Sequence, residues 1–185
     1  QPFSFEDNEI FTSASIGITL YPEDSHDSQE LVRFADMAMY SAKNKKGNRF
    51  HFFQQDMNQK LRRQKEISND IRHALMNDDF HLVFQPQVNA KSLRISGVEA
   101  LIRWEHEGSL MPPQEFLPVA EQNGLMPLIG EWALKNACLS ALNWTHGEHP
   151  ITLAVNVSAA QFHQSDLTAS VQRILKETCF PPERL

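Results

Sequence analysis

The sequence has few of the residues that mark a disulfide-bonded or metal-binding protein. Its only cysteines, Cys138 and Cys179, lie far apart without metal-type spacing, so we expect reduced, packed thiols as in cytosolic proteins. The eight histidines show no metal-ligand spacing either, and we expect His106, His146 and His149 to lie in loops. No apolar run approaches the length of a membrane span, and no secretory signal is visible.

Basic residues are in the minority. The chain has 17 Lys and Arg against 23 Asp and Glu, a formal net charge of −6. This balance argues against general nucleic-acid binding, which needs a basic surface. With 41% hydrophobic residues in a chain of 185, the composition is that of an ordinary globular protein, and length alone suggests one domain.

The string VEALIRW at residues 98–104 is the most informative part of the chain, because it predicts a strand with two different faces. One face is wholly apolar, and the other carries Glu99 and Arg103 on either side of Leu101. Two interpretations are open, since unpaired buried charge is costly. The strand could be half exposed with two surface charges, or it could present a carboxylate for a metal beside an arginine for a phosphate.

Two other segments repeat this pattern of one apolar and one polar face. Residues 81–88 place Gln85 and Gln87 on the polar side, and residues 151–158 place Asn156 and Ser158 there. The polar groups cluster toward the C-terminal ends of the strands, which is where the active site lies in an α/β barrel. An antiparallel sheet with one wet face would show the same alternation.

Helical patterns separate the strands and favour the first of these architectures. Residues 114–123 have apolar side chains at helical spacing and precede Gly124, which suits a C-terminal cap. Another helix starts at Pro127, and a third, around residues 167–175, ends before Pro181. Strands that alternate with amphipathic helices predict an α/β fold.

From about Leu61 to Leu185 the chain resembles the first half of an EAL domain, the cyclic-di-GMP phosphodiesterase family. The one departure we note is Glu107, where the family often has proline, and we expect it to change the loop and not the chemistry. The matching strings are FQPQV (84–88), GVEALIRWEHEGSLMPPQEFLPVAEQNGL (97–125), the helix at 129–144 and VNVSAAQF (155–162).

The resemblance implies a fold, a reaction and a set of site residues. EAL domains resemble TIM barrels whose first strand runs antiparallel to the rest, and they hydrolyse cyclic di-GMP to linear pGpG with two Mg²⁺ or Mn²⁺ ions. Carried onto this chain, Glu99 and Asn156 would be metal ligands. Arg103 would contact a substrate phosphate, and Gln85 would line the substrate pocket. Glu121 is a weaker candidate for orienting the site, and a helix-surface glutamate is an equal alternative.

The first 53 residues resemble the tail of a GGDEF domain, the diguanylate cyclase family. The GGDEF string itself is absent, and the family pattern would place it before Gln1. We expect a helix that Ser28 caps at its N-terminus. The matching strings are TSASIGITLYP (12–22) and LVRFADMAMYSAKNKKGNRFHFF (31–53).

Lys43 is the candidate phosphate contact of this part. Gly47 occupies the family's arginine position, so that second contact is missing or has shifted to Lys45, Lys46 or Arg49. The alternative is a helix that ends in a basic cluster, which suits the helix dipole whatever it binds.

The expected organisation is therefore the C-terminal part of an α+β GGDEF domain (1–54), a connecting helix or linker (55–79), and a partial EAL-type TIM-like (β/α) barrel (80–185). Residues 56–79 contain neither glycine nor proline, which favours a helix over a flexible linker. The overall class is α/β.

The resemblance also implies groups that this chain does not contain. The family places a Glu-x-Thr-Glu strand, an Asp-Asp pair and a later lysine and glutamate after the matched part, and a barrel of this type needs about 250 residues. We therefore expect residues 1–185 alone to be inactive.

Three hypotheses follow: part of a working phosphodiesterase, an inactive module that binds cyclic di-GMP and regulates, or a truncated remnant. The expected partners are cyclic di-GMP, an upstream sensor domain and a second copy in a homodimer, without nucleic acid. The expected location is the cytoplasm, or the cytoplasmic face of the membrane through a region outside this chain.

Overall fold

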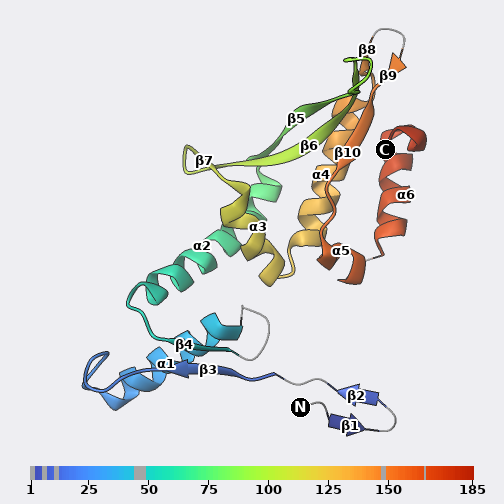
Figure 1. Ribbon diagram of the computed structural model, residues 1–185. Coiled ribbons are helices and arrows are strands. Elements are labelled where there is room, and N and C mark those ends of the chain that lie inside the picture. The colour runs from blue at the N-terminus through green and yellow to red at the C-terminus, as the bar shows by residue number, and fades with distance from the viewer. Residues whose placement is uncertain (1–2, 6–7, 11–12, 44–48, 147–148, 165) are drawn as a thin grey trace. The chain divides into compact units, whose positions relative to one another are not determined.

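The computed structural model forms two compact units, Gln1–Lys65 and Glu66–Leu185 (Figure 1). Each unit has its own core, and each is described by itself. The residues that the structure describes are 3–5, 8–10, 13–43, 49–146, 149–164 and 166–185.

Unit 1 is built around one helix that connects two parallel strands. The helix α1 (Ser28–Lys43) lies between β3 (Ser15–Ile18) and β4 (Arg49–Phe52), and β1 (Phe3–Phe5) pairs antiparallel with β2 (Asn8–Ile10). The strand β3 approaches α1 so closely that a Cβ on Gly17 would fall 1.8 Å from the Ala35 carbonyl oxygen. Glycine is therefore required at this crossing.

The start of α1 corrects one prediction. Ser28 is the first helical residue, and the cap is Asp27, whose Oδ1 accepts a hydrogen bond from the Gln29 backbone N–H at 2.9 Å. Both Asp27 and Ser28 are good capping residues, and the backbone places the carboxylate in the capping position.

A single helix, α2 (Asp56–Met76), contains the last residues of unit 1 and the first residues of unit 2. Its first turn contributes Met57 to the core of unit 1, and its last turns contribute Ile67, Ile71 and Ala74 to the core of unit 2. The absence of glycine and proline agrees with this uninterrupted helix.

The sheet of unit 2 has β6 at its centre. The strand β5 (Phe80–Val88) pairs with β6 (Ile95–His106) in antiparallel fashion, and β10 (Thr152–Val155) pairs with the other edge of β6 in parallel. The short strand β7 (Ser109–Met111) turns back on the end of β6. Among the described strands β10 pairs only with β6, so the sheet does not close into a barrel.

Helices connect β6 to β10 and cover the apolar side of the sheet. Val98, Ala100 and Trp104 of β6 are all buried, as the alternation predicts. Val98 and Ala100 pack in one cluster with the buried Ala137 and Cys138 of α4. The remaining elements are α3 (Pro113–Gln122), α4 (Met126–Ala141), β8 (Thr145–His146), β9 (His149–Pro150), α5 (Ala159–Gln164), α6 (Leu167–Thr178) and the 3₁₀ turn η1 (Pro182–Arg184).

The histidine prediction is wrong, because all three residues lie in strands. His106 ends β6 with only 7% of its surface exposed, and its Nε2 lies 2.9 Å from Oδ2 of Asp70 on α2. His146 and His149 lie in β8 and β9.

The cysteine prediction is wrong for one residue of the two. Cys138 is a buried free thiol, and burial raises its pKa, which lowers its reactivity. Cys179 is exposed, and it ends α6 in a left-handed conformation with a φ of 55°.

Arg184 fastens the end of the chain to the end of α4. Its side chain is buried and donates hydrogen bonds of 2.8–3.0 Å to four backbone carbonyls, while its guanidinium lies over the ring of Phe180. The four carbonyls belong to Ala141, Leu142, Trp144 and Ile151. Carbonyls at a helix C-terminus carry partial negative charge, so they suit a guanidinium.

Ionic contacts fasten α6 to α4 at the other end. Glu131 accepts a hydrogen bond from Ser170 Oγ at 2.6 Å. It also forms an ion pair with Arg173 at 2.9 Å. Lys135 donates to Glu177 at 3.2 Å. The Ser170 hydrogen bond, with help from Arg173, holds the pKa of the Glu131 carboxyl below its ordinary value of 4.5.

We predict that acid weakens the fold partly through Glu131. Because its pKa is lower in the folded chain than in the unfolded chain, the ionised carboxylate stabilises the fold above about pH 4.5, and this stabilisation is lost as the pH falls through the depressed pKa. Glu131→Gln should lower Tm by about 1–3 °C at pH 6, as expected for a half-exposed pair. It should also make Tm less sensitive to acid between pH 5 and 3.

Circular dichroism melts over this pH range would measure the effect. Glu105→Gln, at an exposed position on β6, is the matched control and should follow the parent curve. Equal acid sensitivity in Glu131→Gln and the parent would contradict the assignment.

Candidate functional site

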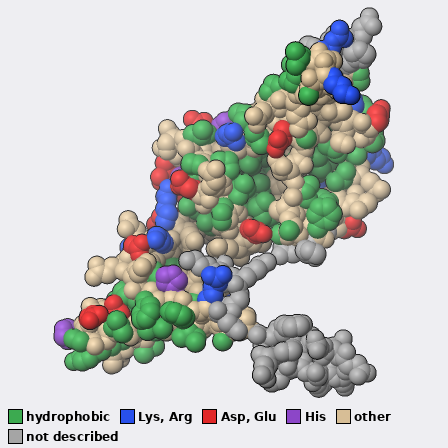
Figure 2. Space-filling model, in the orientation of Figure 1, with side chains coloured by type: hydrophobic (Ala, Val, Ile, Leu, Met, Phe, Trp, Pro, Cys, Tyr) green, Lys and Arg blue, Asp and Glu red, His purple; other side chains and the backbone are tan. Residues whose placement is uncertain are grey.

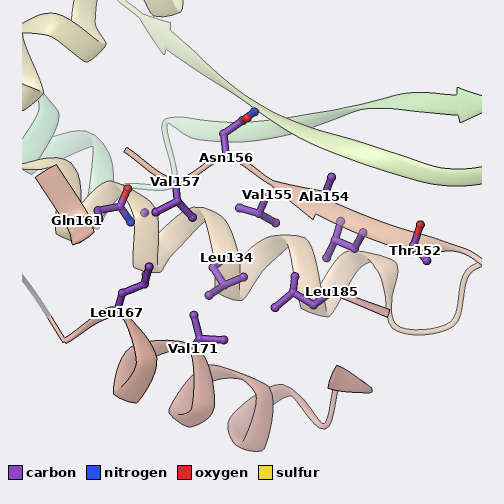
Figure 3. Close-up of a pocket in the computed structure, with 12 residues that line it drawn as sticks. Leu134, Thr152, Ala154, Val155, Asn156, Val157, Gln161, Leu167, Val171 and Leu185 are labelled. Carbon is purple, nitrogen blue, oxygen red and sulfur yellow. The ribbon is translucent and has the colours of Figure 1, made fainter. Parts of the chain in front are cut away.

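The structure brings Glu99 and Asn156 together from neighbouring parallel strands. Glu99 lies opposite Ala154 in the register of β6 and β10, and Asn156 follows two residues later on the same face. Asn156 Nδ2 donates a hydrogen bond to Glu99 Oε1 at 2.6 Å. Figure 3 shows Asn156 extending away from the side where Leu134 of α4 lies.

Gln85 extends this polar row to a third strand. It lies directly opposite Glu99 in the antiparallel register of β5 and β6, and its side chain is exposed. Two adjacent strands and the residue just after a third therefore place an amide, a carboxylate and a second amide on one face of the sheet.

Arg103 lies on the same face of β6 as Glu99, four residues farther along. At the rise of a strand, this separation is roughly 13 Å. Arg103 is half-buried, and its Nη1 donates a hydrogen bond to the Ile102 carbonyl at 2.8 Å. Arg103 and Asn156 both line a cavity of about 260 Å³ between β6, α3, α4 and the segment after β10. Arg103 and Asn156 can therefore contact different parts of one extended ligand.

Two candidates stand apart from this group. Glu121 is exposed on α3 and lines neither of the two cavities that Asn156 lines. Lys43 is the exposed last residue of α1 in unit 1. Lys45, Lys46 and Gly47 lie outside the described residues.

The donor set of the Glu99–Asn156 pair fits a hard divalent cation in part. A carboxylate oxygen and an amide oxygen are ligands that Mg²⁺ and Mn²⁺ accept. The described residues contain no group of three or more His, Cys, Asp or Glu that could hold a metal. The pair alone offers two oxygen donors, fewer than such an ion takes.

The surface charges agree with the acidic composition. Among the described residues on the face in Figure 2, Lys and Arg side chains are scattered between Asp and Glu and form no extended basic patch. None of the helices in the described ranges is long and apolar enough to span a membrane.

Sequence reasoning missed Gln161, whose side chain is only 5% exposed beside the site. It reaches back to Ser158, two residues after Asn156. The string S-A-A-Q carries the pattern of a helix capping box, which would have indicated this contact.

Comparison with known proteins identifies both parts of the chain. The EAL domain family matches residues 68–185, well over half of the chain. This chain belongs to the EAL domain family. The diguanylate cyclase GGDEF domain family matches residues 1–49, so the tail of a GGDEF domain precedes a partial EAL domain.

The EAL chain has similar relatives among curated signalling proteins. It is 42% identical over 187 residues to the bifunctional diguanylate cyclase/cyclic di-GMP phosphodiesterase MucR of Pseudomonas aeruginosa, a match of the whole chain to 27% of MucR. It is 33% identical over 180 residues to the cyclic di-GMP phosphodiesterase PdeR of Escherichia coli, a match of 97% of the chain to 27% of PdeR. The chain thus spans about a quarter of the length of these relatives.

Solved EAL structures resemble unit 2. The MucR phosphodiesterase in complex with c-di-GMP superposes with a TM-score of 0.60 at 41% identity, over 65% of this chain and 49% of that one. The FimX EAL domain of Xanthomonas citri in complex with c-di-GMP gives 0.59 at 25% identity, over 69% and 50%.

Proposed function

We propose that the protein containing this EAL chain is a cyclic di-GMP phosphodiesterase that hydrolyses one phosphodiester bond and yields linear pGpG. The observation that carries this proposal is the contact between Asn156, just after the end of β10, and Glu99 of the neighbouring parallel strand β6. The family membership supports the proposal and the substrate class.

The proposed whole fold is a TIM-like barrel to which unit 2 contributes the first strands. An antiparallel β5 followed by the parallel pair β6 and β10 is the order that this barrel type begins with. A groove of about 410 Å³ lies along β10, and it is lined mostly by apolar side chains such as Leu134, Val171 and Leu185 (Figure 3). A further parallel strand would pair with the free edge of β10 and cover this groove.

Glu99 and Asn156 would hold the Mg²⁺ or Mn²⁺ ions of the reaction. The amide of Asn156 would rotate about its terminal torsion. Oδ1, in place of Nδ2, would then face the ion beside Glu99. When bound, such ions lower the pKa of a water ligand and clamp the attacked phosphate. Further ligands would come from other parts of the protein.

Arg103 and Gln85 would bind the substrate. The planar guanidinium of Arg103 suits a phosphate oxygen pair, and its distance along β6 directs it to a part of the dinucleotide remote from Glu99. Gln85 would hydrogen-bond to the substrate beside the metal ligands. Glu121 would orient the site from α3, and Lys43 would contact a phosphate in the GGDEF part.

The whole protein would respond to an upstream sensor domain and act as a homodimer. We infer both partners only from the resemblance to GGDEF–EAL proteins.

Glu99→Gln tests the proposed reaction in the complete gene product. The change keeps the shape of the side chain and removes its charge, so hydrolysis of cyclic di-GMP should fall by at least about 100-fold, since even outer-shell partners of a metal cost 10–100-fold. Chromatography of pGpG would measure the rate. Glu105→Gln is the control and should leave it unchanged; near-parental activity of Glu99→Gln would refute the metal role.

Arg103→Ala tests substrate binding separately from chemistry. Loss of a charge-assisted contact should weaken binding of cyclic di-GMP by about 1.5–3 kcal/mol, or roughly 10- to 150-fold in Kd. Calorimetry in metal-free buffer would measure it, with Arg94→Ala at an exposed position as the control.

Unchanged affinity in Arg103→Ala would contradict the phosphate contact. Arg103-dependent binding in a protein without hydrolysis would favour the regulatory module over the enzyme.

A further inference from the structure

Three hydrogen bonds connect Ser158 and Gln161 in the segment after β10. The backbone N–H and the Oγ of Ser158 both donate to Gln161 Oε1 at 3.0 Å, and the backbone N–H of Gln161 donates to Ser158 Oγ at 3.3 Å. This is a reciprocal capping box at the start of α5. It bonds the side chain of Gln161 to the segment that leaves β10.

Gln161 also fits against α4 at a single glycine. A Cβ on Gly130 would lie 2.0 Å from Gln161 Nε2 and 2.7 Å from its Cδ, so only glycine leaves room for the amide. Gln161 is a buried polar side chain, and it lines both cavities that Asn156 lines. Figure 3 shows it reaching from α5 toward α4.

Asn156 needs a support of this kind. The pairing of β10 with β6 ends at Val155 opposite Ala100, one residue before Asn156. Val157 is 44% exposed, so burial of its side chain holds the segment only weakly. The Ser158–Gln161 hydrogen bonds are the next attachment along the chain.

We propose that Gln161 is a positioning residue for Asn156. Its amide oxygen holds Ser158 and its amide group lodges against Gly130, and together these contacts keep the segment after β10 in the conformation that directs the Asn156 amide to Glu99. The link to metal binding rests on the proposed function; the link to the Asn156–Glu99 contact stands without it.

The side-chain amide signals of Asn156 in ¹⁵N-labelled protein test the structural part. The signal pair that is absent from Asn156→Asp identifies the residue. In Gln161→Ala the pair should move to the position of a solvent-exposed asparagine, because the hydrogen bond to Glu99 is lost. Gln172→Ala, at an exposed position on α6, is the control and should leave the pair unchanged.

Gly130 gives a second, independent arm. Gly130→Ala should move the same signals although the Gln161 amide is still present, because the new Cβ displaces it. The double variant Gly130→Ala/Gln161→Ala should match Gln161→Ala alone, since the colliding side chain is gone. Asn156 signals at their parental position in Gln161→Ala, or additive shifts in the double variant, would overturn the proposal.

Fold integrity is checked by the indole signal of buried Trp104. If Gln161→Ala does not fold, Ser158→Ala replaces it, because this change removes two of the three hydrogen bonds and leaves the core intact. It should move the Asn156 signals in the same direction, and parental signals there would count against the proposal equally.

The metal dependence of hydrolysis in the complete gene product tests the functional part. Gln161→Ala should raise the Mg²⁺ concentration for half-maximal rate by about 10-fold or more, the cost of losing an outer-shell partner. A purely structural role would lower the amount of folded enzyme and leave that concentration unchanged, which would refute positioning. If Glu99→Gln keeps its activity while Gln161→Ala still releases Asn156, the proposed function fails and the positioning contact stands.

Discussion

The alternation of side chains along β6 is the constraint on which unit 2 depends. Successive residues of a strand point to opposite faces. Because Val98, Ala100 and Trp104 are buried against the helices, Glu99 and Arg103 must lie on the other face. The antiparallel partner β5 and the parallel partner β10 then add Gln85 and Asn156 to that face. Packing on one side of the sheet thus assembles the polar group on the other.

This dependence explains why much of the fold could be predicted from the sequence. The strands and the helices that connect them follow from apolar spacing, which is a local property, and Gly124 and Pro127 mark boundaries through their own backbone preferences. Glu99 and Asn156 could be named together from the sequence because both lie in strings that resemble the EAL family. Their distance and their hydrogen bond required the structure.

Contacts between distant parts of the chain could not be predicted, because they do not follow from local spacing. The buried His106 contacts Asp70, which is 36 positions away in the sequence. The fit of Gln161 against Gly130 depends on how α5 meets α4, which no local pattern describes. The prediction of the cap of α1 was wrong by one residue. Asp27 and Ser28 both suit the capping position, and only the direction of the backbone decides between them.

The two attachments of α6 and η1 to α4 differ in the chemistry of their acceptors. Near the start of α4 the acceptors are carboxylates, which protonate in acid; near its end Arg184 binds backbone carbonyls, which do not. Protonation in acid therefore affects the contacts near the start of α4 and does not affect those near its end. We therefore expect acid to weaken the contact of α6 with the first half of α4 and to leave the Arg184 contacts at the end of α4 in place.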